Sequence, residues 1–171
     1  ADISAQEPYS GRLFEGNEAT LYYEVIGNES VIPLFVLNGG PGVNHNYLHP
    51  SKVWDKLAKN HTVVFYDQRG TGKSPVLQSK QTCTLEDQIN DLDALRRNLG
   101  YEKIILIGHS WGGYLSMAYS VMFPDRVEKM ILVCSAAPKW AENIFLFDYV
   151  FPETVERRKQ LALAAELGDA D

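Results

Sequence analysis

Short apolar runs alternate with amphipathic stretches along most of this chain, and each run is four to eight residues long. Such runs, rich in β-branched and aromatic residues and bounded by Gly, Asn or Asp, indicate buried strands. We predict strands over residues 20–26, 31–37, 62–66, 103–107 and 127–134.

The clearest predicted helix follows Thr84, which we expect to be its N-cap, with Asp87 three residues later. Its apolar positions recur at steps of four and three, and Gly100 is a typical stop signal. The recurring residues are Leu85, Ile89, Leu92, Leu95 and Leu99. We predict a short helix within residues 51–59 and a longer one over 110–123, which Pro124 ends.

Strands that alternate with helices predict an α/β fold with a mostly parallel sheet and right-handed crossovers. In such sheets, functional residues gather at the carboxyl ends of the strands. Three Gly-rich runs of this chain begin at such ends, near residues 38, 67 and 108. We therefore look for the functional site among these three loops.

The run Gly108-His109-Ser110-Trp111-Gly112 fits the pattern G-x-S-x-G between a predicted strand and a predicted helix. A sharp strand-to-helix turn exposes the serine hydroxyl in a strained conformation, and glycines leave room for the crowded backbone. We predict that Ser110 is a nucleophile and that the Trp111 N–H is one oxyanion donor. His109 lies inside the motif, and we interpret it as structural.

The run Asn38-Gly39-Gly40-Pro41-Gly42 lies where a second oxyanion donor is needed. Glycine lets the backbone approach a substrate and turn an N–H toward it. Gly39 is our first choice for this donor and Gly40 the second.

The run from Asp67 to Ser74 ends in Gly-Lys-Ser, but a phosphate-binding loop needs Gly five positions before Gly72, where Asp67 stands. We instead expect Asp67 and Arg69 to order the neighbouring loops through charge-assisted hydrogen bonds.

Together these three runs resemble the prolyl aminopeptidase (proline iminopeptidase) family of α/β-hydrolases. That family shows His-Gly-Gly-Pro-Gly, then Asp-Gln-Arg-Gly-x-Gly-x-Ser, then Gly-x-Ser-x-Gly-Gly, and this chain departs from it at Asn38. The resemblance spans residues 20–138. It implies an α/β-hydrolase fold, a serine nucleophile at Ser110, an oxyanion hole from Gly39 and Trp111, and small peptide or amide substrates with N-terminal proline. Sister families include esterases and lactonases.

The resemblance also implies a helical cap. The composition of the chain changes after Pro138, where residues 140–151 are rich in aromatic side chains. We assign residues 1–138 to the N-terminal part of the hydrolase core and 139–171 to the beginning of the cap. Gly40, Phe145 and Tyr149 are candidate substrate-binding residues. Packing of the cap against the core is the alternative for the two aromatic residues.

The triad order of this fold is Ser, then Asp or Glu, then His. All four histidines of the chain, His45, His49, His61 and His109, precede Ser110. We expect the fold to be truncated before its last strands, with the acid and the base supplied by a segment outside this chain, which alone is inactive or incomplete. Recruitment of His45 or His49 as an unusual base and a non-catalytic peptide-binding remnant are the alternatives.

The predicted strand 127–134 is apolar and would form a hydrophobic sheet edge if it had no neighbour. We therefore expect a complementary C-terminal segment or self-association to cover it.

Composition narrows the remaining classes of function. The 171 residues carry a net charge of −6 with no basic cluster, which argues against nucleic acid as a partner. The apolar runs are too short for a membrane span, which needs about 20 residues. Cys83 and Cys134 indicate neither a disulfide framework nor a metal site, and the expected chemistry needs no cofactor. The compartment stays open between the cytoplasm, the default, and export, because the chain starts at Ala1 without Met.

Overall fold

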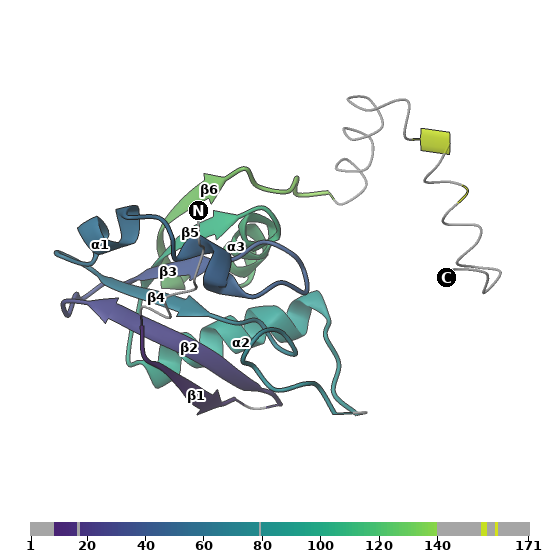
Figure 1. The fold of residues 1–171 in the computed structure, drawn as a ribbon, viewed down its shortest axis with the longest axis horizontal. Coiled ribbons are helices and arrows are strands. Elements are labelled where there is room, and N and C mark those ends of the chain that lie inside the picture. The colour runs from purple at the N-terminus through teal and green to yellow at the C-terminus, as the bar shows by residue number, and fades with distance from the viewer. Residues whose placement is uncertain (1–8, 17, 79, 140–154, 157–159, 161–171) are drawn as a thin grey trace, which may run out of the picture. The chain divides into compact units, whose positions relative to one another are not determined.

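The computed structural model describes residues 9–16, 18–78, 80–139, 155–156 and 160. Its centre is a six-stranded sheet in the order β1-β2-β4-β3-β5-β6 (Figure 1). The strands are β1 (Gly11–Glu15), β2 (Thr20–Gly27), β3 (Leu34–Leu37), β4 (Thr62–Tyr66), β5 (Ile104–His109) and β6 (Val127–Val133). Strands β4, β3, β5 and β6 are parallel, whereas β1 and β2 pair antiparallel. The predicted mostly parallel sheet is confirmed.

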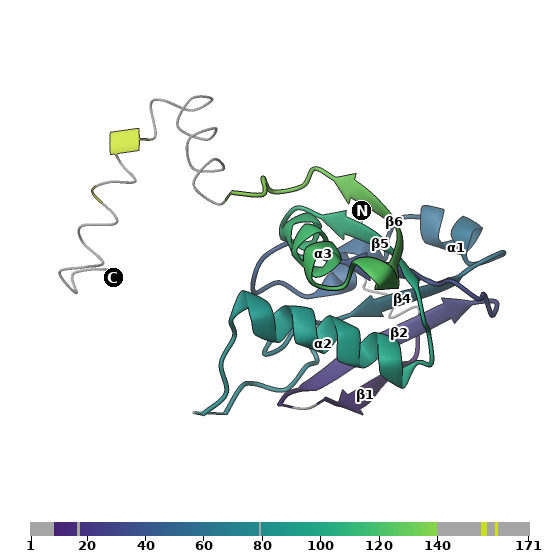
Figure 2. The same cartoon turned by 180° about the vertical axis from the view of Figure 1, so that it is seen from behind.

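Helices cover both faces of this sheet. They are η1 (His45–Leu48), α1 (Val53–Leu57), α2 (Leu85–Asn98), α3 (Trp111–Met122) and the short η2 (Pro124–Arg126). Figure 2 shows α2 and α3 in front of the strands, and α1 lies behind them. The predicted start of α2 is confirmed, because the Thr84 hydroxyl accepts the Asp87 N–H and the Asp87 carboxylate accepts the Thr84 N–H.

Two apolar cores follow from this layering. Phe35 and Leu37 of β3 pack with Leu92, Leu95 and further residues of α2 and α3 on one face. Their alternate neighbours on β3 pack on the other face with Trp54 of α1. A strand buried on both faces reads as a continuous apolar run, and β3 is such a strand. Its carboxyl end, where Asn38 begins the Gly-rich loop, is therefore held firmly.

One strand prediction was wrong at its start, and one strand was not predicted. The expected strand over residues 31–37 starts only at Leu34, because Pro33 has no N–H for the ladder and Val31 is 91% exposed. We did not predict β1, which pairs with β2 at the sheet edge and leaves Leu13 58% exposed.

Strand β6 is the edge of the sheet within the described residues. Its apolar side chains are open to solvent, and Met130, Ile131, Leu132 and Val133 are each about 40–50% exposed. A parallel edge of this kind offers both apolar surface and unpaired backbone groups to a neighbour.

The chain divides into two compact units, residues 1–135 and 136–171. The candidate substrate residues Phe145 and Tyr149 lie outside the described residues. Among the described residues, no helix has the length and apolar character needed to cross a membrane.

Candidate active site

Ser110 lies at the turn between β5 and α3 in a backbone conformation that residues other than glycine rarely adopt. Its φ is 52° and its ψ is −118°, and its N–H donates to the carbonyl oxygen of Val133 at 3.1 Å. A non-glycine residue there stores about 1–3 kcal/mol of strain. The strained strand-to-helix turn expected from the sequence is therefore present.

The glycines around Ser110 are sterically required. A Cβ on Gly112 would lie 2.2 Å from the carbonyl oxygen of Leu37, and one on Gly108 would lie 2.5 Å from that of Gly112. A Cβ on Gly113 would lie 2.2 Å from the Ser135 hydroxyl oxygen. The first turn of α3 can thus press against the end of β3, which brings Ser110 beside the Gly39 loop.

The Asn38 side chain holds together the loop that follows β3. Its side-chain amide is buried and donates to the carbonyl oxygens of Gly39 at 2.9 Å and Val43 at 2.7 Å. The Gln68 amide donates to the Asn38 carbonyl oxygen at 3.2 Å. Asn38, which stands where the family has a histidine, is therefore also a polar side chain that shapes the loop.

Gly39 lies directly against the nucleophile. A Cβ added to it would lie 3.2 Å from the Ser110 Cβ and 3.1 Å from the Tyr47 hydroxyl oxygen. The Gly39 N–H donates to that hydroxyl at 2.6 Å, and the hydroxyl also lies 2.7 Å from His109 Nδ1. Tyr47, from η1, was not singled out in the sequence, and it engages the N–H that was our first choice for the oxyanion hole.

Asp67 links two loops at the carboxyl end of β4. Its Oδ1 accepts the His45 N–H at 2.9 Å and lies 2.6 Å from His45 Nδ1, while Oδ2 accepts the Lys73 N–H at 2.8 Å. Burial alone would raise the pKa of Asp67, but these hydrogen bonds outweigh it and the pKa lies below its ordinary value. The same pairing raises the pKa of His45 to about 8 against the opposing effect of burial.

Arg69 ties the loop after β4 to α2. Its guanidinium meets the Asp91 carboxylate in a bidentate pair, with Nε–Oδ2 at 2.7 Å and Nη2–Oδ1 at 2.8 Å. A further N–H donates to the carbonyl oxygen of Thr82 at 2.7 Å. Asp67 and Arg69 thus make the loop-ordering contacts that the sequence suggested.

His45 and His49 face the buried carboxylate of Glu24. Both nitrogens of His45 lie against carboxylates, and its side chain is fully buried. This arrangement argues against His45 as the base for Ser110. His49 is turned to the same Glu24 oxygen.

A hollow of about 430 Å³ adjoins the loop that follows β3 and the loop that follows β4. Its lining includes Pro41, Gly42, Arg69, Cys83 and Gln88, and the Gln88 side chain accepts the indole N–H of Trp111 at 3.2 Å. Cys83 and Cys134 are both exposed thiols without a disulfide.

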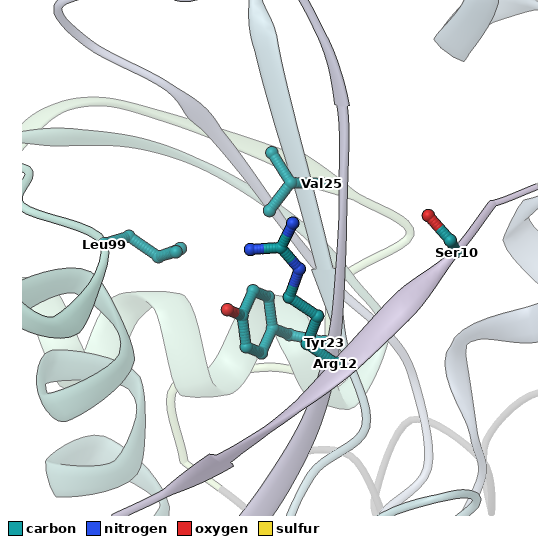
Figure 3. Close-up of a pocket in the computed structure, with 5 residues that line it drawn as sticks. All are labelled: Ser10, Arg12, Tyr23, Val25 and Leu99. Carbon is teal, nitrogen blue, oxygen red and sulfur yellow. The ribbon is translucent and has the colours of Figure 1, made fainter.

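A second cavity, of about 350 Å³, lies between β1, β2 and the end of α2 (Figure 3). Ser10, Arg12, Tyr23, Val25 and Leu99 line it, and none of these belongs to the three loops. The first hollow is therefore the better candidate for a substrate.

Comparisons with known proteins agree with this geometry. Residues 32–169 match the family described as the alpha/beta hydrolase fold. The chain is 38% identical to a proline iminopeptidase of Lactobacillus crispatus over 81% of this chain and 48% of that protein. It is 35% identical to a proline iminopeptidase of Arabidopsis thaliana over 74% of this chain and 33% of that protein.

Solved structures share the fold. A proline iminopeptidase-related protein of Thermus thermophilus superposes with a TM-score of 0.66 at 29% identity, covering 74% of this chain and 45% of that one. An esterase of Exiguobacterium antarcticum superposes with a TM-score of 0.65 at 26% identity, covering 75% and 47%. The chain spans about half the length, or less, of the relatives it matches. The expectation of an α/β-hydrolase fold is confirmed, and the chain belongs to the α/β-hydrolase fold family.

Proposed function

We propose that the protein is a serine hydrolase that releases an N-terminal proline, or a similar small residue, from small peptides or amides. The observation that carries the proposal is Ser110, held in a strained turn against the Gly39 loop. The similarity to a proline iminopeptidase over 81% of the chain supports the proposed substrate class.

In the proposed reaction Ser110 attacks the carbonyl carbon of the N-terminal residue and forms an acyl-enzyme, which water then hydrolyses. A histidine takes the proton from the Ser110 hydroxyl and delivers it to the leaving amine, and an acid orients that histidine. We propose that both come from polypeptide outside these 171 residues, since its relatives are about twice as long. The same polypeptide would cover the open apolar edge of β6.

The oxyanion of the tetrahedral intermediate needs two N–H donors. Trp111, at the start of α3, supplies one because it follows the nucleophile directly. For the other, the Tyr47 hydroxyl already accepts the Gly39 N–H at 2.6 Å, which favours our second choice, Gly40, as the donor that meets substrate. Tyr47 accepts the Gly39 N–H and Asn38 donates to the Gly39 carbonyl oxygen, and we propose that these two contacts orient the Gly40 N–H for this role.

The hollow lined by Gly42 and Arg69 adjoins the loop that carries Gly40, and we propose it as the surface that binds the reacting peptide. We retain Phe145 and Tyr149 as proposed cap residues against the proline ring, because an apolar ring is bound best by aromatic side chains.

The substrate class is tested by comparing a proline arylamide with a short-chain aryl ester, using the protein produced from its complete gene. The proposal expects a larger kcat/KM for the arylamide and loss of turnover in Ser110→Ala. Preferential turnover of the ester would replace the peptidase assignment with that of an esterase. No turnover of either substrate would favour a non-catalytic binding protein.

A further inference from the structure

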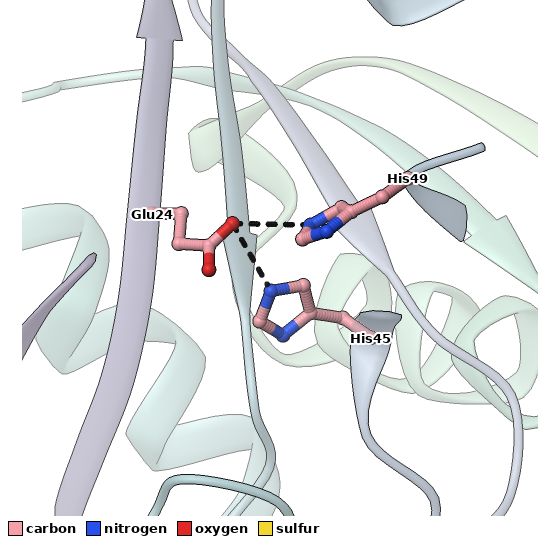
Figure 4. Close-up of side chains that lie close together, drawn as sticks. All are labelled: Glu24, His45 and His49. Carbon is pink, nitrogen blue, oxygen red and sulfur yellow. Dashed lines mark ion pairs between the residues drawn. The ribbon is translucent and has the colours of Figure 1, made fainter. Parts of the chain in front are cut away.

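Glu24, His45 and His49 form a buried group, which we call the Glu-His-His cluster. Glu24 lies in the middle of β2, whereas His45 and His49 are four residues apart on η1 and its C-cap. Figure 4 shows both imidazole rings turned toward one oxygen of the Glu24 carboxylate. The cluster shares no residue with the three loops proposed for catalysis.

The three ligand-type atoms of the cluster are buried without a hydrogen bond. The side chains of Glu24, His45 and His49 are 2%, 0% and 8% exposed. Glu24 Oε2 lies 3.4 Å from His45 Nε2 and 3.0 Å from His49 Nε2, yet none of these atoms makes a hydrogen bond of acceptable geometry within the described residues. Buried polar atoms of native proteins are nearly always satisfied. These three atoms pair with one another only as ions, and a further group between them would satisfy all three.

Two of the three distances in the cluster suit a metal ion. Zinc binds histidine nitrogen at about 2.0–2.1 Å and carboxylate oxygen at about 2.0–2.2 Å, so two ligand atoms on a tetrahedral ion lie about 3.3 Å apart. The pairs with Glu24 measure 3.4 and 3.0 Å. All three ligand atoms lie within 4.8 Å of one another, and because two ligands of one zinc ion are at most about 4.2 Å apart, binding would draw the two histidine nitrogens toward each other. Two histidines with one glutamate are also a known zinc donor set.

Outer partners orient two of the ligands. The Asp67 carboxylate lies 2.6 Å from His45 Nδ1 and favours a proton on that nitrogen, so Nε2 is the nitrogen that can give up its proton and bind an ion. The Tyr22 hydroxyl donates to Glu24 Oε1 at 2.8 Å and leaves Oε2 as the ligand atom. A carboxylate behind a metal-binding histidine is the usual second layer of such sites.

We propose that Glu24, His45 and His49 bind a divalent first-row transition metal ion, with Zn²⁺ as the best match to the nitrogen and oxygen donors. The ion would join η1 to β2 and leave a fourth position for water. Tyr47 lies between the two histidines in the sequence, and its hydroxyl accepts the Gly39 N–H. The ion would therefore also stiffen the loop beside Ser110. Binding itself does not depend on the proposed peptidase activity.

The test measures Zn²⁺ binding by calorimetry and metal analysis, using chelator-treated protein produced from its complete gene. Metal binding competes with protons on histidine, so the titration is repeated at rising pH until the affinity no longer increases. We expect one equivalent of Zn²⁺ in the wild type and at least about a 100-fold loss of affinity in His49→Gln, since a ligand contributes more than an outer partner, whose loss costs about 10–100-fold. The control His61→Gln changes a histidine outside the cluster and should bind as the wild type does.

Substitution with Co²⁺ tests the wild type without any variant. A four-coordinate site gives intense visible absorption bands, which Zn²⁺ should abolish by displacement. Absence of stoichiometric Zn²⁺ binding, or equal affinities in wild type and His49→Gln, would overturn the proposal. The cluster would then be a plain ion-pair network, whether or not the protein hydrolyses peptides.

Discussion

The backbone strain at Ser110 gives a prediction that separates the two smallest replacements for the nucleophile. Ser110→Ala retains a Cβ at φ 52° and ψ −118°, whereas Ser110→Gly removes it. Both variants lose the hydroxyl, so the difference between them reports the backbone alone. We predict that Ser110→Gly is the more stable of the two.

The magnitude follows from two opposing contributions. Residues with a Cβ lose about 1–3 kcal/mol in such a conformation, and glycine avoids this cost. Glycine in turn loses about 0.5–1 kcal/mol more than alanine through the greater freedom of its unfolded chain. The net difference in the free energy of unfolding is about 1 kcal/mol in favour of Ser110→Gly. For a domain of this size that shifts Tm by about 2–4 °C.

Urea unfolding followed by tryptophan fluorescence measures the difference. Ser120, on the same helix α3, provides a matched control, because glycine at a regular helix position costs about 1 kcal/mol relative to alanine. The order of stability should therefore be reversed between the two positions. If glycine destabilises both positions equally, Ser110 is not strained and the reasoning is refuted.

Three further changes test the loops around the site. Arg69→Met leaves the buried Asp91 without its partner and should lower the free energy of unfolding by about 3–5 kcal/mol; the double variant Arg69→Met/Asp91→Leu should recover most of that loss in urea unfolding. Tyr47→Phe removes the hydroxyl that holds the Gly39 peptide and should lower kcat about tenfold at nearly unchanged KM, whereas a change in KM alone would contradict this role. Hydrogen bonds, chiefly from the Thr82 hydroxyl, hold the pKa of Asp87 below its ordinary value. The stabilisation that they provide is present above about pH 4, the unfolded pKa, and is lost as pH falls through the folded pKa. The free energy of unfolding should therefore fall less steeply with acid in Asp87→Asn than in the wild type.

The sequence predicted best those elements whose signals are local. Strand β4 occupies the predicted residues 62–66, and α2 begins after Thr84 because the capping box and the leucine spacing point to the same start. The turn at Ser110 was predictable for the same reason. A Cβ on the glycines of its motif would clash with atoms a few residues away or at the end of β3, so glycine is required there.

Features set by tertiary contacts were not predictable in this way. Strand β1 is held by its pairing with β2, and its exposed Leu13 gives no clear alternation. The contact of Tyr47 with Gly39 arises only when η1 folds back over the loop. His45 and His49 are four residues apart, but Glu24 joins them from β2 only through the fold, so no local pattern predicts the Glu-His-His cluster.

Whether Ser110 is the nucleophile is best tested by active-site labelling. A fluorophosphonate is added to the protein produced from its complete gene, and the modified peptide is located by mass spectrometry. The account predicts one adduct on Ser110, retained in the control Ser120→Ala and absent in Ser110→Ala. An adduct on another residue, or an unlabelled Ser110 in the folded protein, would contradict it.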